Sequence, residues 1–274
     1  MLMNVAIYVG TENLRCDERV IKLVGDLEKG GCGVCFTSLD EPLGEDTDIL
    51  LSVGGDGTFL SAALKAVRAD IPVAGVNMGR MGFLSEYRGE DIAQALISGE
   101  YTIEKRVMLC SEIAGQEDLS SDCHLALNEM TIRRNGGAML AVDVSVDGVR
   151  LPTYWGDGLI ISTSSGSTAY SLSVGGPIVL PQSKVFIISP IAPHNLNVRP
   201  LVVPSTSVIS MTAHSRDGHF EFSADTRTTE LTDGAQIDVS MAQFSLKRLR
   251  LDKSNFIQAL VEKLYWGEDV RNIR

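Results

Sequence analysis

The hydrophobic pattern of this 274-residue chain changes character close to residue 102, and that change limits the folds open to it. Before that point, short apolar strands alternate with amphipathic helices. After it, apolar and polar residues alternate in successive runs bounded by turn residues. Alternating strands and helices predict a parallel sheet with right-handed crossovers, whereas repeated two-residue periods predict antiparallel sheets. The chain is therefore expected to have an α/β part followed by an all-β part.

The first hundred residues predict a Rossmann-like α/β domain. The first helix is expected to place Val20, Leu23 and Leu27 on one face, with Asp17 at its N-cap or in its first turn. Strands are expected at residues 5–9, 34–39, 48–53 and 72–77, and helices at residues 17–28, 60–67 and 92–97.

The second part predicts a β-sandwich-like domain. The pair Asp147-Gly148 predicts a hairpin turn between two strands, because this dipeptide adopts the left-handed backbone that tight hairpins need. Further strands are expected at residues 125–133, 159–162, 185–189, 208–212, 220–223, 237–240 and 244–251. An amphipathic helix capped by Ser254 is expected at 255–266. The predicted domains are residues 1–101 and 102–252, with residues 253–274 forming a C-terminal helix that returns to the first domain.

Charge and cysteine content exclude several function classes. Lys and Arg number 24 and Asp and Glu number 35, so the net charge is 24 − 35 = −11, and no nucleic-acid partner is expected. No apolar run is long enough to cross a bilayer, and the first residues do not resemble a secretory signal, so no membrane association is expected. Five cysteines, an odd number, fit reduced thiols in the cytoplasm.

Residues 54–58 read GGDGT and lie between a buried strand and the start of a helix. Such a turn directs backbone N–H groups and a helix dipole at an anion, and its glycines let a phosphate approach the main chain. Neither GxxxxGK[ST] nor a GxGxxG after a strand is present. A carboxylate beside phosphates costs free energy unless it binds a metal ion or accepts a proton, so Asp56 favours phosphoryl transfer over passive binding. The alternative is a tight turn in which Asp56 bonds its own backbone.

Two further motifs lie in the second part. Residues 156–177 read GDGLIISTSSGSTAYSLSVGGP, a run of hydroxyls and glycines that can hydrogen-bond ribose and base edges while Tyr170 stacks on a ring. The alternative is an ordinary Ser/Thr-rich loop. Asn128-Glu129 ends an apolar run, and because strand neighbours face opposite ways, both can contact one ligand only at a strand end or bulge.

Together these motifs resemble the NAD kinase family, in order and over nearly the whole chain. The segment GRMGFL at 79–84 and the pair Arg199-Pro200 also match that family. The GGDGT loop alone is also found in diacylglycerol-type lipid kinases and related phosphofructokinases. The sequence GSTAYSLSVGGP at 166–177 is far more specific, because lipid kinases lack it.

The resemblance implies transfer of the ATP γ-phosphate to the 2′-hydroxyl of the adenosine ribose of NAD, with a divalent metal, Mg²⁺ or Mn²⁺. It implies that Asp56 accepts the hydroxyl proton or positions the hydroxyl. The substrate-binding residues that it implies are Gly54, Gly55, Asp56, Gly57, Thr58, Phe83, Asn128, Glu129, Asp157, Ser165, Thr168, Ala169, Tyr170, Ser173 and Ala192. It also implies a homodimer or homotetramer formed through the sandwich domain, in which a neighbouring subunit can complete the site.

Three positions depart from the family pattern. Asp225-Thr226-Arg227 stands where the family often has Asp-Gly-Gln, so Arg227 replaces a glutamine that usually makes a contact. Trp155 stands where a basic or polar residue is common, and Met139 where some relatives are basic. These positions bear on the choice between NAD and NADH and on feedback by NADP.

Two other functions compete with the leading one. A lipid or sugar kinase would share the GGDGT loop, but Asn128-Glu129 and the lack of a basic amphipathic segment disfavour it. A sensor that binds NAD or NADP without catalysis is the other, and Asp56 argues against it. The active site is expected in the cleft between the two parts, where backbone amides and Mg²⁺ must attract polyanions to an acidic chain.

Overall fold

The computed structural model describes residues 3–79, 82–114, 124–252, 255–264 and 266. Contacts divide the chain into two units. The first unit contains residues 1–105 and 246–274, and the second contains residues 106–245. The chain therefore leaves the first unit once and comes back to it.

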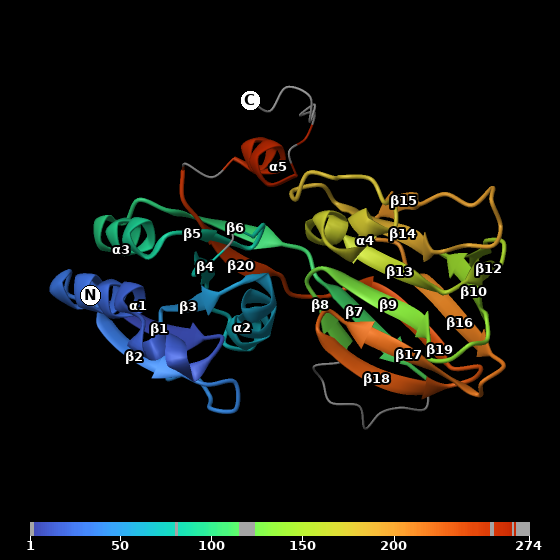
Figure 1. Cartoon of the computed structure of the whole chain (residues 1–274), viewed down its shortest axis with the longest axis horizontal. Coiled ribbons are helices and arrows are strands. Elements are labelled where there is room, and N and C mark those ends of the chain that lie inside the picture. Colours follow the sequence, from blue (N-terminus) through green and yellow to red (C-terminus); the bar gives the residue numbers. More distant parts are fainter. Residues whose placement is uncertain (1–2, 80–81, 115–123, 253–254, 265, 267–274) are drawn as a thin grey trace. The chain divides into compact units, whose positions relative to one another are not determined.

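The first unit is built on a seven-stranded sheet in the order β2-β1-β3-β4-β20-β6, with β5 paired to β4 (Figure 1). Its strands are β1 (Asn4–Val9), β2 (Gly33–Thr37), β3 (Ile49–Gly54), β4 (Val73–Asn77), β5 (Ser85–Tyr87), β6 (Thr102–Arg106) and β20 (Leu246–Arg250). Its helices are α1 (Glu18–Lys29), α2 (Asp56–Arg68), α3 (Gly89–Ser98) and α5 (Phe256–Leu264), preceded by the 3-10 turn η1 (Glu12–Cys16). The pairings of β1 with β2 and β3, and of β3 with β4, are parallel, as the alternation of strands and helices predicts.

Helices cover both faces of this sheet. Odd-numbered residues of β1 and β3, such as Ile7 and Leu51, are buried in one cluster with Leu23 and Leu27 of α1 and with apolar residues of α3. The opposite face receives α2, whose buried Phe59 lies against β4 at Gly75. Side chains of a strand point alternately to the two faces of the sheet. A strand with helices packed on both faces is therefore buried at every position. All six residues of β3 are buried accordingly.

One segment of the first unit differs from the sequence-based expectation, and part of another lies outside the described residues. The strand predicted at 244–251 was placed in the second part, yet it forms β20 of the first sheet, where Arg248 pairs with Val73. A two-residue period shows that a segment is a strand but does not identify its partner. The predicted cap Ser254 lies outside the described residues. The side chain of Asn255 accepts from the backbone N–H of Ile257 at 3.0 Å at the start of α5.

The second unit is a sandwich of two antiparallel sheets. One sheet has the order β11-β10-β16-β19-β7-β8 with β12 paired to β10, and the other has the order β15-β14-β13-β9-β17-β18. The first contains β7 (Leu109–Ile113), β8 (Leu125–Ala126), β10 (Leu140–Val146), β11 (Val149–Arg150), β12 (Tyr154–Gly156), β16 (Ile209–Ser215) and β19 (Gln236–Met241). The second contains β9 (Glu129–Arg134), β13 (Gly158–Thr163), β14 (Val185–Ile191), β15 (Leu201–Pro204), β17 (His219–Ala224) and β18 (Arg227–Thr232). The 3-10 turn η3 (Ser165–Thr168) and the short helix α4 (Tyr170–Ser173) follow β13.

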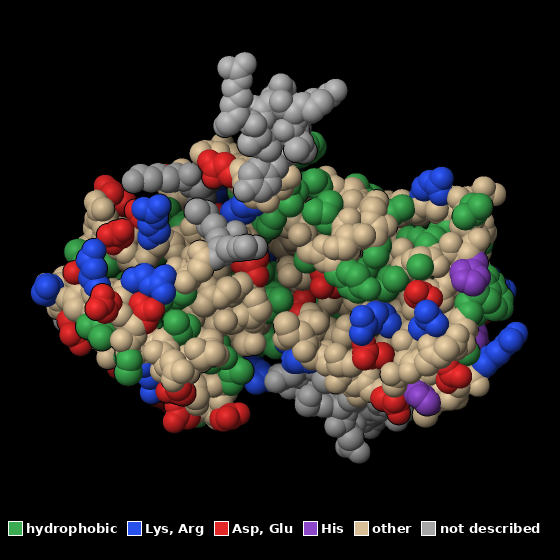
Figure 2. Space-filling model, viewed as in Figure 1, with side chains coloured by type: hydrophobic (Ala, Val, Ile, Leu, Met, Phe, Trp, Pro, Cys, Tyr) green, Lys and Arg blue, Asp and Glu red, His purple; other side chains and the backbone are tan. Residues whose placement is uncertain are grey.

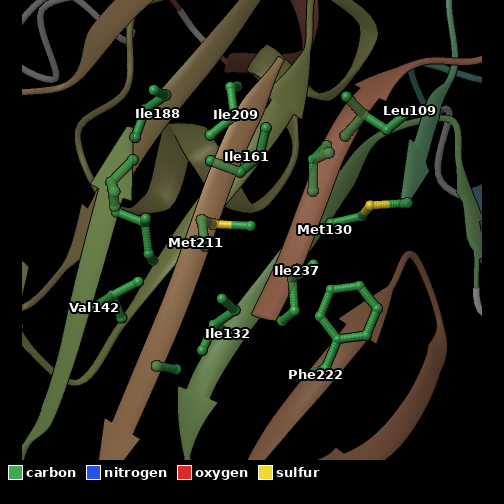
Figure 3. Close-up of a cluster of buried hydrophobic side chains, with 14 of the residues drawn as sticks. Leu109, Met130, Ile132, Val142, Ile161, Ile188, Ile209, Met211, Phe222 and Ile237 are labelled. Atoms are coloured by element: carbon green, nitrogen blue, oxygen red, sulfur yellow. The ribbon is translucent and has the colours of Figure 1, made fainter. Parts of the chain in front are cut away.

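The core of the second unit joins inward-facing side chains of both sheets (Figure 3). Ile132 and Ile161 belong to one sheet, and Val142 and Met211 belong to the other. The predicted hairpin at Asp147-Gly148 joins β10 to β11, and both residues have positive φ angles, 51° and 79°. These two units confirm the predicted fold class, an α/β domain and an all-β sandwich-like domain.

Two negative findings concern the described residues alone. No helix among them is both long and apolar enough to cross a bilayer. The thiols of Cys16, Cys32, Cys35 and Cys110 are free, and Cys123 lies outside the described residues.

Candidate active site

The GGDGT loop lies at the carboxyl end of β3, where the chain turns into α2. In the sheet order β2-β1-β3, the chain goes from β1 to β2 on one side and then to β3 on the other side of β1. A topological switch point therefore lies between β1 and β3. Ligands of open α/β sheets bind outside the carboxyl ends of the strands at such a point. Gly10, just after β1, donates its N–H to the Val53 carbonyl of β3 at 3.0 Å and so joins the two strands at this point.

The glycines of this loop have two different roles. A Cβ at Gly54 or at Gly10 would meet the Thr58 hydroxyl oxygen at 2.5 Å, so Thr58 packs into space that only glycine leaves. A Cβ at Gly55 or Gly57 would have no described atom within 4 Å. The first N–H groups of α2 have no partner within the helix, because the chain before them is not helical. Bare backbone and unpaired N–H groups together make the start of α2 suited to binding an anion.

Asp56, the first residue of α2, is fixed by a neighbouring segment of backbone. Its Oδ2 accepts from the Phe83 N–H at 2.9 Å, and its Oδ1 accepts from Leu84 at 3.1 Å and Ser85 at 2.8 Å. A Cβ at Gly82 would lie 1.9 Å from Oδ1, so this glycine lets the segment approach the carboxylate. The alternative in which Asp56 bonds its own loop is therefore not what the structure shows. The carboxylate instead connects the GGDGT loop to the GRMGFL segment, of which Arg80 and Met81 lie outside the described residues.

The other side of the same segment is held by two basic side chains from the end of the chain. Arg248 of β20 donates from Nη2 to the carbonyls of Phe83 and Leu84, each at 3.2 Å. Lys263 of α5 donates to the Gly82 carbonyl and lies 4.8 Å from the centre of the Phe83 ring. Burial lowers the pKa of Lys263. The sequence gives no sign of these roles, because both residues sit in ordinary strand and helix patterns more than 160 residues after Gly82.

A second polar site lies in the β unit, where β9 begins at Asn128-Glu129. Asn128 is 7% exposed, and neither its Oδ1 nor Glu129 Oε2 has a hydrogen-bond partner among the described residues. Buried polar atoms in proteins are nearly always paired, so two such atoms at adjacent residues indicate a position completed by a ligand or water. Burial, and then the charge of Asp225, raises the pKa of Glu129 to about 8, although the backbone N–H of Tyr170 opposes this.

Several groups of the hydroxyl-rich run after β13 are hydrogen-bonded within the protein. Ser164 donates to the Pro181 carbonyl at 2.9 Å, Ser167 donates to the Ser164 carbonyl at 2.8 Å, and both serines are buried. Ser165 accepts from Arg106 at 3.4 Å, and Tyr170 donates its backbone N–H to the Glu129 carboxylate. The buried serines therefore shape the loop, and the N–H of Tyr170 brings the start of α4 next to Glu129.

Asp157 and Ala192 lie elsewhere in the same sheet. In the pairing of β9 with β13, Ser162 is opposite Glu129 while Gly158 is opposite Arg133. Asp157 is thus beside the other end of β9, where its carboxylate forms an ion pair with Arg134 at 2.8 Å. Ala192, with a φ of 43°, follows Ile191, which pairs with Gly158. The structure therefore brings the backbone of Tyr170 to Glu129 and places Asp157 at the other end of β9, while the Tyr170 side chain bonds to Arg133, beside Arg134.

The structure also shows where the three residues that depart from the family pattern lie. Arg227 donates from Nη2 to the Leu125 carbonyl, so it is not a free surface arginine. Trp155, on β12, is 45% exposed and pairs with Ala141. Met139 comes directly before β10. Arg227 alone among them lies in the hydrogen-bonded surroundings of Asn128-Glu129.

The two units favour one class of enzyme, a kinase: a glycine-rich loop suited to binding an anion lies on an α/β sheet, and a polar site with unpartnered buried oxygens lies on a β sandwich. Comparison with known proteins identifies the family. The ATP-NAD kinase N-terminal domain matches residues 20–101, and the ATP-NAD kinase C-terminal domain matches residues 127–251. The chain belongs to the NAD kinase family.

Individual relatives agree with this result. The NAD kinase of Cytophaga hutchinsonii is 40% identical over 229 residues, which cover 82% of this chain and 78% of that protein. The NAD kinase of Flavobacterium psychrophilum is 38% identical over 239 residues, which cover 86% and 81%.

Two solved structures are also similar. A yeast NADH kinase complexed with NADH has a TM-score of 0.85 at 25% identity, covering 100% of this chain and 90% of that one. An NAD kinase from Archaeoglobus fulgidus in complex with ATP has a TM-score of 0.78 at 28% identity, covering 96% and 99%.

Proposed function

We propose that this protein transfers the γ-phosphate of ATP to the 2′-hydroxyl of the adenosine ribose of NAD, giving NADP and ADP. The observation that carries the proposal is the position of Asp56, an oriented carboxylate on the first residue of a helix whose start is suited to binding phosphate. Relatives named NAD kinase at 38–40% identity, and similar kinases solved with ATP and with NADH, support the substrates.

Asp56 has the geometry of a general base or of a residue that positions the hydroxyl. An ionised carboxylate offers about four acceptor positions, and three are used by the N–H groups of residues 83–85. The remaining position can accept the 2′-hydroxyl. In the transfer, a bond forms between the 2′-oxygen and the γ-phosphorus, the bond from that phosphorus to the bridging oxygen of ADP breaks, and the hydroxyl proton passes to Asp56. Holding the two oxygens in line is the main requirement of such loose phosphoryl transfers.

The triphosphate needs positive charge, which a chain of net charge −11 supplies only locally. The N–H groups at the start of α2 provide part of it. The described residues contain no cluster of three His, Cys, Asp or Glu side chains that could hold a metal ion. Asp56 already accepts three backbone N–H groups, and its remaining acceptor position is assigned to the 2′-hydroxyl. Mg²⁺ or Mn²⁺ is therefore proposed to enter bound to the ATP phosphates, as part of the substrate.

The dinucleotide is proposed to bind Asn128 and Glu129. Their buried, unpartnered oxygens accept hydrogen bonds from hydroxyl or amide groups of a ligand, and Glu129 in its neutral form can also donate one. The loop that starts at Ser165 and the ring of Tyr170 are proposed to border the same ligand, with Thr168, Ala169 and Ser173.

Asp157 and Ala192 are proposed to act on the dinucleotide held by a second copy of the chain. Four residue steps of β9 separate the pairs Gly158–Arg133 and Ser162–Glu129, which is roughly 13 Å at ~3.3 Å per residue. One subunit therefore cannot readily bring Asp157 and Glu129 to the same part of a ligand. Figure 2 shows hydrophobic side chains gathered on the second unit. Two hydrophobic residues of this unit, Leu196 and Val202, are 82% and 44% exposed. A homodimer or homotetramer would cover such residues.

One incubation tests the function. Purified protein is mixed with ATP, Mg²⁺ and NAD, and NADP is measured with an NADP-specific dehydrogenase. We expect NADP to form. Phosphorylated lipid or sugar in place of NADP would favour the other kinase assignment, and tight NAD binding without turnover would favour a sensor.

A mixing experiment tests the subunit proposal. Asp157→Ala and Asn128→Ala variants are each expected to be weak enzymes, and dimers formed from both should regain part of the activity, because one of the two sites is then intact. Light scattering gives the oligomeric state, and a fully active monomer would overturn the shared site. The cytoplasmic location expected from the reduced cysteines stays a prediction.

A further inference from the structure

The backbone at Asn128-Glu129 is held by a side chain from a distant part of the sequence. Three consecutive backbone N–H groups lie at this point, those of residues 127–129. All three donate to one carboxylate, that of Asp225: Leu127 to Oδ2 at 2.8 Å, Asn128 to Oδ1 at 2.8 Å and Glu129 to Oδ1 at 3.2 Å. Asp225 thus supplies the acceptors for the whole turn into β9.

Asp225 is itself fixed on the opposite side. It is the first residue of the two-residue turn between β17 and β18, with a φ of 51°, and its own N–H donates to the Glu129 carbonyl at 2.9 Å. Aspartate and asparagine tolerate this left-handed conformation better than most other side chains. Burial raises the pKa of Asp225, whereas the N–H groups that bond to it and the positive charge of Arg227 favour its ionised form. Arg227 in turn donates to the Leu125 carbonyl, two residues before the turn that Asp225 holds.

The carbonyl side of the turn is held separately, by the last residue of β13 and the loop after it. The Thr163 hydroxyl donates to the Leu127 carbonyl at 2.6 Å, and the Thr163 N–H donates to the Asn128 carbonyl at 2.9 Å. A Cβ at Gly166 would lie 2.1 Å from the same Asn128 carbonyl oxygen. The backbone of 127–129 is therefore bonded on both sides, which leaves the side chains of Asn128 and Glu129 free for a ligand.

We propose that Asp225 is a positioning residue for the dinucleotide: its carboxylate holds the backbone of residues 127–129 so that the side chains of Asn128 and Glu129 meet the substrate. Asp225 does not touch the substrate in this scheme. Arg227, the first residue of β18, supports Asp225 by its charge and supports the chain before the turn by donating to the Leu125 carbonyl. This inference rests on the proposed function, because it assumes that Asn128 and Glu129 bind NAD.

The test is Asp225→Asn, which retains the size of the side chain and the left-handed turn but replaces one acceptor oxygen by an NH₂ group that faces backbone N–H. We expect the KM and the Kd for NAD to rise about tenfold to a hundredfold, the range for losing a hydrogen bond to a charged group. The KM for ATP should stay within about twofold of the wild-type value, since the ATP loop lies in the other unit.

Asp147→Asn is the matched control. Asp147 also has a φ of 51° and a carboxylate that accepts a backbone N–H across a loop, from Val208 at 2.8 Å, but it belongs to the β10–β11 hairpin of the other sheet. Its substitution should lower the melting temperature without changing the KM for NAD. If Asp225→Asn lowers the melting temperature yet binds NAD like the wild-type protein, Asp225 is merely structural and the proposal is wrong.

A second variant keeps the proposal testable if Asp225→Asn does not fold. Arg227→Gln removes the charge beside Asp225 and leaves the carboxylate in place, and we expect a rise in KM for NAD of about twofold to fivefold, with ATP unaffected. Equal changes for both substrates, or none for NAD, would overturn the proposal. If the wild-type protein itself makes no NADP, the proposed function has failed, and that outcome is distinct from an active wild type with an unaffected Asp225→Asn variant.

Discussion

Arg248 Nη2 lies 2.8 Å from Glu86 Oε1, and the two side chains are 7% and 16% exposed. This ion pair joins β20, near the end of the chain, to β5, and the same nitrogen donates to the carbonyls of Phe83 and Leu84. The N–H groups of residues 83–85 bond to Asp56. The segment beside the candidate catalytic carboxylate is thus held from both sides by groups that are far apart in the sequence.

Arg248→Met should therefore destabilise the protein and reduce activity together. Removing one partner of a buried pair leaves the other charge buried and costs about 3–5 kcal/mol. Thermal unfolding and kcat measure the two effects. The double variant Arg248→Met/Glu86→Leu removes both charges and should regain much of the stability. A single variant as stable as the wild-type protein would show that the pair contributes nothing.

Asp56→Asn should reduce kcat on the order of 10²–10⁴-fold, the usual contribution of a general base. Asparagine still accepts through one oxygen, so the hydrogen bonds to residues 84 and 85 can persist while the one from Phe83 is lost. The melting temperature should fall by a few degrees at most. Asp17→Asn, at the N-cap of α1, is the control, because Asp17 also accepts a backbone N–H at a helix start. An active Asp56→Asn enzyme would exclude the proposed role.

Gly82→Ala should displace the Asp56 carboxylate, because the added Cβ would lie 1.9 Å from Oδ1. A shift of about 1 Å in a reacting group can cost on the order of a hundredfold in rate. The readout is kcat at saturating ATP and NAD. Gly79→Ala, where a Cβ meets no described atom within 4 Å, should leave kcat unchanged. Equal rates for the two variants would contradict the close approach.

Glu129 gives a prediction about pH. Its pKa is about 8 in the folded protein against 4.5 ordinarily, so the folded state binds more protons than the unfolded state between these values. Stability from this group is complete below about pH 4.5 and is lost as the pH rises through 8. A glutamine at this position cannot titrate. The melting temperature of Glu129→Gln minus that of the wild-type protein should therefore increase between pH 5 and pH 8 and stay constant above pH 9. A difference independent of pH would contradict the raised pKa.

Sequence patterns predicted the local structure of the candidate site well. The GGDGT loop forms the turn from β3 into α2, and Asp147-Gly148 forms a hairpin. Both depend on backbone preferences that act within a few residues. The reversal of strand order between β1 and β3, which gives the loop its place beside Gly10, follows from strand pairing and cannot be seen in any one segment.

The two kinds of domain and the residues able to do phosphate chemistry can be predicted from the amino-acid sequence, because periodicity and glycine-rich turns are local properties of the chain. Three relationships could not be predicted and are seen in the folded chain: Arg248 and Lys263 hold the segment beside Asp56, Asp225 holds Asn128-Glu129, and Asp157 lies at the far end of β9. Each of these relationships joins a backbone donor or acceptor to a side chain distant in sequence. Their partners are fixed by the packing of strands and helices, which pattern and propensity do not encode.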